Sequence, residues 1–155
     1  MGRMYSTSFS GVAVTALQDL FSLIAAANKP VKLHACYISQ LSDVGDAAEE
    51  MLRVDIVRGN GTVGSGGSAP TIYALRSTDP AAAATARAND TTEASAGTEQ
   101  IMHSECFNIR AGWVYMPTPK MQISTNSADD IIAVRLLTVP ADELTMCGTL
   151  YFEEE

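Results

Sequence analysis

The sequence predicts an all-β fold, an antiparallel β-sandwich built as one domain over residues 1–155. Apolar and polar residues alternate with period two along several segments, as expected of half-buried strands. Turn-forming residues separate these segments at short intervals. Hydrophobic residues make up 46% of the chain and charged residues 18%, which is typical of a folded protein with a sizeable core. Strands that bury one face need a second sheet, or closure into a barrel, to cover that face.

The first expected strands are 3–10, 19–25 and 31–39. The second is ambiguous, because the apolar residues between Val14 and Ile24 also recur at helical spacing. A strand is the preferred interpretation and a helix the alternative. Pro30 begins the third strand, after an Asn-Lys turn signal.

In the next strand, 51–58, Leu52 and Val54 alternate with Arg53 and Asp55. The glycine-rich residues 59–64 then match the spacing G-x-G-x-x-G. A dinucleotide site would need a helix directly afterwards, and the following Ser, Gly and Pro residues cannot begin one. We therefore expect a flexible loop here, with a tight turn at Asn60–Gly61.

Residues 78–98 are rich in Ala, Thr, Asp and Asn and have little to bury. They predict a low-complexity surface excursion or a weak edge strand. Further strands are expected at 101–108, 112–116, 120–125, 131–139 and 145–152.

Metal and catalytic motifs are weak in this sequence. His34 and Cys36 would share one face of their strand, opposite Leu33 and Tyr37, and we expect ordinary packing or an inter-subunit surface there. A zinc site with His103 and Cys106 is the alternative, although the ligand spacing does not fit one.

Carboxylates cluster in two places, at 43–50 and at 153–155. Turn capping, or a cation site at Asp43 and Asp46, is expected for the first, and a solvated end or a contact with a basic partner for the second. No G-x-S-x-G motif occurs. We expect no enzymatic activity, no cofactor and no metal.

The charge balance disfavours several classes of partner. The net charge of −8 would repel nucleic-acid phosphates and anionic membrane surfaces, so we expect neither as a partner. The beginning of the chain lacks the apolar core of a secretory signal, which predicts synthesis in a cytosol. Three widely spaced cysteines do not predict a disulfide framework.

The segment from Arg110 to Pro117 contains the only tryptophan. Core packing is the simpler interpretation of Trp113. The alternative is an anchor at a subunit contact, where Trp, Tyr, Met and Arg are enriched. The candidate interface residues are Trp113, Tyr115, Met116, Tyr73 and Arg110.

Several stretches resemble small virion proteins of tailed bacteriophages. These stretches are 14–21, 29–34, 39–46, 107–113 and 146–154. The resemblance covers nearly the whole chain and implies a jelly-roll-like sandwich that decorates or cements the phage head. It further implies a homotrimer bound to the major capsid protein, located on the capsid surface of the virion and, during assembly, in the host cytoplasm. No site residues follow from it.

Three functional hypotheses therefore remain. The leading one is a structural protein that stabilises a capsid by protein–protein contacts. The second is a carbohydrate- or host-receptor-binding module, with Trp113, Tyr115 and Tyr73 as stacking residues. The third, a cupin-like metalloenzyme, is disfavoured because the chain has only two histidines.

Overall fold

The computed structural model describes residues 2–42 and 49–155, and it is all-β as predicted. Within these residues there are eleven strands, one short 3-10 turn and no α-helix. The elements are β1 Arg3–Val14, β2 Gln18–Ile24, β3 Val31–Ser42, β4 Met51–Asn60, β5 Ile72–Ala74, β6 Thr85–Asp90, β7 Gln100–Asn108, β8 Trp113–Tyr115, η1 Pro119–Met121, β9 Ser124–Thr125, β10 Ile131–Leu136 and β11 Leu144–Glu154.

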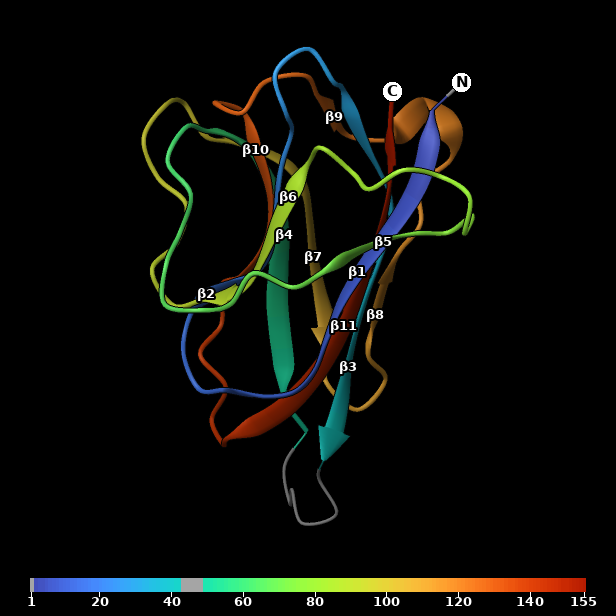
Figure 1. Cartoon of the computed structure of the whole chain (residues 1–155). Helices are drawn as coiled ribbons and strands as arrows, with labels where there is room; N and C mark the ends of the chain where they lie inside the picture. Colours follow the sequence, from blue (N-terminus) through green and yellow to red (C-terminus); the bar gives the residue numbers. More distant parts are fainter. Residues whose placement is uncertain (1, 43–48) are drawn as a thin grey trace.

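The strands form two antiparallel sheets that pack face to face (Figure 1). Sheet A has the order β5-β1-β11-β3-β8, with β9 also pairing with β3, and sheet B has the order β6-β2-β10-β4-β7. Without β5, β6 and β9, the two sheets have the interleaved strand order of a jelly roll, in which successive strands alternate between sheets except for β4 and β7, which are neighbours in sheet B. The predicted jelly-roll-like sandwich is therefore confirmed.

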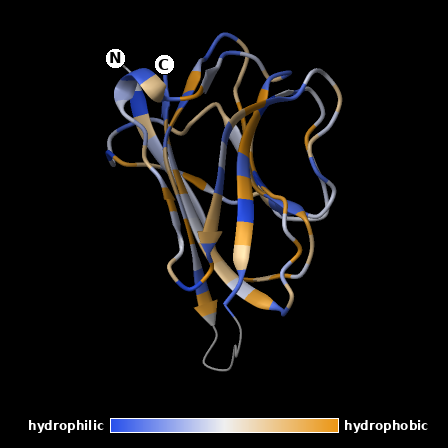
Figure 2. Cartoon of the chain, turned by 180° about the vertical axis from the view of Figure 1, so that it is seen from behind, coloured by the Kyte–Doolittle hydropathy of each residue, from blue (hydrophilic) through white to orange (hydrophobic). Residues whose placement is uncertain are grey.

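Alternation along the strands positions the core between the sheets. β11 is the clearest case, because every second residue from Leu144 to Glu154 is buried. Figure 2 shows the corresponding bands of high and low hydropathy along the strands. The largest fully buried side chains include Tyr5, Phe21 and Phe152, and the rings of Tyr5 and Phe152 stack with centroids 5.6 Å apart.

The residues between β4 and β7 form an insertion that extends both sheets. β5 pairs with β1 at the edge of sheet A, and β6 pairs with β2 at the edge of sheet B. Segments 61–69 and 91–98 run side by side, joined by bridges such as Thr62 to Ser95 and Ser65 to Thr92. The insertion covers the β1–β2 side of the sandwich and part of the outer face of sheet B (Figure 1).

The structure contradicts the expected tight turn at Asn60–Gly61. β4 extends through Asn60, and the glycine-rich segment then packs against the backbone of residues 88–98. Gly59 has a φ of +101°, and a Cβ there would lie 2.1 Å from the carbonyl oxygen of Thr98. Only glycine allows so close a backbone approach, so this segment is a packed strap rather than a solvated loop. Of the two alternatives for 78–98, an edge strand is present as β6, with Ala86 and Ala88 buried.

The segments 19–25 and 120–125 were both expected to be strands. The strand predicted at 19–25 is β2, so its helical alternative is wrong. The strand predicted at 120–125 is also wrong, because Pro119 begins a 3-10 turn there and only Ser124–Thr125 pair with β3. Proline favours the first position of such a turn, because its φ angle is already helical.

The expectation that His34 and Cys36 share a face is wrong as well. In the β3–β11 register, Leu33 pairs with Phe152 and Ala35 with Tyr151, so His34 is an extra residue in a bulge. A bulge shifts the alternation by one residue. Cys36 therefore lies fully buried in the core, while His34 is only half-buried.

Candidate functional site

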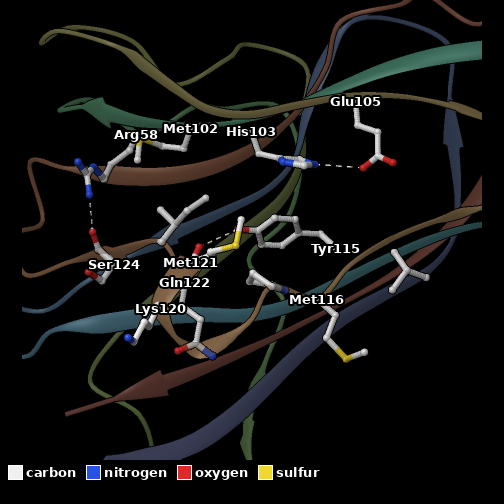
Figure 3. A pocket seen from close by; sticks show the side chains of 13 residues that line it. Arg58, Met102, His103, Glu105, Tyr115, Met116, Lys120, Met121, Gln122 and Ser124 are labelled. Carbon is white, nitrogen blue, oxygen red and sulfur yellow. Dashed lines mark hydrogen bonds and ion pairs between the residues drawn. The ribbon is translucent and has the colours of Figure 1, made fainter.

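The sandwich has one side that the insertion does not cover, between the edge strands β7 and β8. A groove with a volume of about 480 Å³ lies there (Figure 3). Its walls come from β7, from β8 and from the segment that follows β8. The lining residues are Arg58, Met102, His103, Glu105, Val114, Tyr115, Met116, Pro117, Lys120, Met121, Gln122, Ile123 and Ser124.

One wall of the groove is a set of stacked and hydrogen-bonded side chains. Trp113 is buried, and its indole Nε1–H donates a hydrogen bond of 2.9 Å to Oε2 of Glu105. Nε2 of His103 lies 3.1 Å from the same oxygen, and its ring centroid is 4.9 Å from that of Tyr115. The hydrogen bonds from Trp113 and His103 lower the pKa of Glu105. A carboxylate therefore stays ionised beside the aromatic wall.

The opposite end of the groove is positively charged. The Arg58 guanidinium donates to the carbonyl oxygen of Ser124 at 2.9 Å and lies 3.7 Å from a carboxylate oxygen of Asp130. Lys120 lies on the exposed turn η1 and forms no ion pair with any described residue. Between the two ends, the flexible side chain of Met121 lies beside the Tyr115 ring, and Met102 lies towards Arg58 (Figure 3). The groove thus offers an adaptable apolar centre between opposite charges.

A second candidate surface is the outer face of sheet A, which no other segment of the described chain covers. We call it the sheet A face, and its central residues are Ser6, Ser8, Tyr37, Ser39, Tyr73, Val114, Cys147, Thr149 and Tyr151. None of these side chains carries a charge. The Tyr37 and Tyr151 rings meet edge to face, with centroids 6.0 Å apart. The Tyr37 hydroxyl also reaches Sδ of Met116 at 3.8 Å.

A cluster of charged side chains borders one end of this face. Nε2 of His34 and Nζ of Lys32 lie 3.1 Å and 3.7 Å from Oε2 of Glu153. The hydrogen bond from Lys32 to Glu155 raises the pKa of the lysine. This ion-pair cluster connects β3 to the end of the chain and borders the uncharged centre.

The candidate interface residues predicted from the sequence separate into four places. Tyr115, 8% exposed, lines the groove, and Trp113, 3% exposed, lies behind it, stacked on Tyr115 and hydrogen-bonded to Glu105. Met116, 70% exposed, lies at the groove rim beside the sheet A face. Tyr73, 66% exposed, lies on the sheet A face, and Arg110 lies in the exposed turn between β7 and β8.

Sequence reasoning missed a group of buried carboxylates that hold loops in place. Glu154 is 7% exposed and accepts a hydrogen bond of 2.7 Å from the backbone N–H of Ala84. Glu50 accepts one of 2.7 Å from Ala141 in the same way. The expectation of a solvated acidic end is therefore wrong for Glu154. The alternation of apolar and other residues from Leu144 to Phe152 was the available signal, because its next step places Glu154 on the inner face.

Asp19 and Arg135 form the most buried ion pair among the described residues. Arg135 Nε donates to Asp19 Oδ1 at 2.7 Å, and Asp19 also accepts a bond of 2.7 Å from the backbone N–H of Ala94. Burial alone would lower the pKa of Arg135, but the hydrogen bond and charge of Asp19 raise it above its usual value. The pair fixes the 91–98 strap on the outer face of sheet B.

The described residues contain no group of three or more His, Cys, Asp or Glu side chains close enough to hold a metal ion. Asp43 and Asp46, the expected cation ligands, lie outside the described residues. All three cysteines are free. No described helix is long and apolar enough to cross a membrane.

Comparison of the chain with protein-family models, with curated proteins and with solved structures found no match.

Proposed function

We propose that this chain is a structural protein of a tailed-bacteriophage virion, which decorates or cements the head shell through its sheet A face. The proposal places it on the capsid surface, bound to the major capsid protein, after assembly in the host cytoplasm. A jelly roll serves many unrelated functions, so the fold alone does not carry the proposal. The uncharged sheet A face carries it.

The chain has 10 basic and 18 acidic residues, yet none of these lies in the centre of the sheet A face. The outer face of sheet B differs, because the 91–98 segment packs over Asp19 and Arg135 and forms hydrogen bonds to both through the backbone of Ala94. Cores of protein interfaces are depleted in charge and enriched in Tyr and Met, although they are also depleted in Ser. The absence of charge, the three tyrosines and the flanking Met116 fit that composition, whereas the serines of the face do not.

The proposal includes a homotrimer on the capsid lattice. Icosahedral shells offer threefold positions that a cyclic trimer matches. Each copy has a net charge of −8, so copies that approach through charged surfaces repel one another. Native mass spectrometry of the purified protein tests the trimer separately from shell binding.

The decisive experiment measures binding to phage heads. Antibodies against the purified protein are expected to label the heads of intact virions, and particles made without the protein should lose DNA on heating. Ser8→Glu and Thr149→Glu place charges in the centre of the face and should abolish binding. Val139→Glu, an exposed apolar position elsewhere, is the matched control. Absence of the protein from virions, or equal binding by the charged variants, would show the proposal to be wrong.

Carbohydrate or host-receptor binding is the second candidate, because three tyrosines lie on one flat sheet face. Tyr37, Tyr73 and Tyr151 offer stacking surfaces, whereas Trp113 is buried and donates to Glu105. A glycan array probed with the purified protein tests this alternative. Binding that Tyr73→Ala and Tyr151→Ala remove, with labelling of fibres rather than heads, would favour it over the capsid proposal.

A further inference from the structure

The edge of sheet B at β7 has an unused backbone. β7 pairs with β4 from Asn108 to Gln100 and is the last strand of its sheet. In the described part of the chain, no backbone hydrogen bond joins the opposite edge of β7 to another segment. A row of unpaired N–H and C=O groups on such an edge can pair with a strand from another molecule.

This edge lacks most of the features that normally prevent such pairing. Proteins protect long edges with Lys or Pro residues, with bulges or by keeping the strand short. β7 has nine residues and contains neither Lys nor Pro. It has one register shift, at Met102. Ile101 and Met102 are 58% and 42% exposed, so the edge is long and accessible and carries two adjacent exposed apolar side chains.

The groove described above continues directly from this edge. A strand added to β7 would direct every second side chain towards the groove, because side chains alternate between the two faces of a sheet. Met102, Met116 and Met121 line it, and their unbranched thioether side chains adapt to apolar groups of different shapes. The volume of about 480 Å³ is enough for more than one such side chain.

The charges of the groove specify the occupant further. At one end the Glu105 carboxylate is already hydrogen-bonded by Trp113 and lies beside His103. At the other end Lys120 forms no ion pair with any described residue. An occupant with a carboxylate at the Lys120 end would therefore complete the charge pattern.

We propose that this groove binds an extended segment of a partner protein, which adds to β7 as a further strand of sheet B. The segment presents apolar side chains at alternate positions to the groove and one carboxylate to Lys120. Main-chain pairing supplies much of the affinity, and the groove supplies the sequence preference. This site is built on the β7 edge of sheet B and shares only Val114 with the residues that define the sheet A face, so the inference stands whether or not that face binds a capsid.

The test is selection of a random dodecapeptide display library against the full-length protein. We expect enriched peptides with alternating apolar residues and an acidic residue at a constant distance from them. Hydrogen–deuterium exchange with one synthetic enriched peptide should slow exchange in Gln100–Asn108. Met121→Glu, at a position 69% exposed and so not required for folding, should weaken that peptide at least about tenfold, while Leu75→Glu, 54% exposed and outside the groove, should not.

A charge reversal makes the test specific. Selection against Lys120→Glu should enrich a basic residue in place of the acidic one, and this variant should bind the original peptide about fivefold more weakly. The inference is overturned if no peptide is enriched, or if the enriched peptides leave exchange of β7 unchanged. It is also overturned if β7 is covered by a second copy of the chain in solution. Each of these outcomes is independent of whether antibodies against the protein label phage heads.

Discussion

Replacement of Arg135 by Met is expected to destabilise the protein strongly. The guanidinium is 6% exposed and its Nε and Nη2 lie 2.7 Å and 3.2 Å from the oxygens of Asp19, which is fully buried. Nη2 also donates to the carbonyl oxygen of Ala94 at 3.0 Å. In the variant, Asp19 retains only the Ala94 N–H at 2.7 Å. A buried carboxylate would then lack its counter-charge, which costs about 3–5 kcal/mol.

That loss is a large share of the stability of a domain, which is about 5–15 kcal/mol. At about 2–4 °C per kcal/mol for a chain of this size, the melting temperature should fall by roughly 6–20 °C. Urea unfolding followed by the fluorescence of Trp113, the only tryptophan, measures the free energy directly. Lys32→Met, which removes a partly exposed ion pair, is the control and should cost at most about 1 kcal/mol.

A double variant separates the charge effect from lost packing. Asp19→Leu combined with Arg135→Met removes both charges, and should recover about 2 kcal/mol or more relative to the single variant. Recovery will be incomplete, since the Ala94 N–H then lacks its acceptor. If Arg135→Met costs no more than Lys32→Met, or if the double variant is the less stable of the two, the buried pair does not hold the strap as reasoned.

Three further predictions test the core, the cysteines and the groove. Gly148→Ala should cost about 1–3 kcal/mol in urea unfolding, because its Cβ would meet two phenylalanine rings and one isoleucine at 2.7–2.9 Å; unchanged stability would show that the core relaxes freely. Cys106 is exposed whereas burial raises the pKa of Cys36, so mass spectrometry should find iodoacetamide on Cys106 well before Cys36, and equal rates would contradict this. The lowered pKa of Glu105 means that its hydrogen bond to Trp113 is present above the ordinary glutamate range and is lost as pH falls through the lowered pKa. The fluorescence emission of Trp113 should therefore change only as pH falls through the lowered pKa of Glu105, and the same titration of the Glu105→Gln variant should lack the change.

Much of the sandwich was predictable because a strand that buries one face must alternate. β11 follows that rule throughout and β4 in its first four residues, whereas β10 is buried at every position, with its Arg135 bonded to Ala94 of the 91–98 segment. Each of the three was expected within a few residues of its observed bounds. The failures occur where a local irregularity interrupts the alternation. At His34 one extra residue turned Cys36 into the core, and at Pro119 a 3-10 turn replaced most of a strand. Bulges and short turns depend on the neighbouring strand, so a single segment does not reveal them.

The candidate site was predictable only in part. Trp113 and Tyr115 were identified as aromatic residues of interest; the structure places Tyr115 in the groove wall and Trp113 behind it, stacked on Tyr115. Their partner Glu105 was not identified, since β7 and β8 belong to different sheets and approach each other only after both sheets have formed. Sequence spacing reports neighbours along one strand, and it is silent about contacts across the open side of a sandwich.

By itself, the sequence determined the all-β class, the strands that alternate and the acidic charge, because these follow from local periodicity and composition. The tertiary structure alone decided which sheet face stays uncovered and which side of the sandwich stays open. The insertion between β4 and β7 binds over one side through buried carboxylates such as Asp19, whose N–H and guanidinium partners lie far away in the chain. A low-complexity segment therefore became a packed strap, and the uncharged sheet A face remained exposed because no strap of the described chain crosses it.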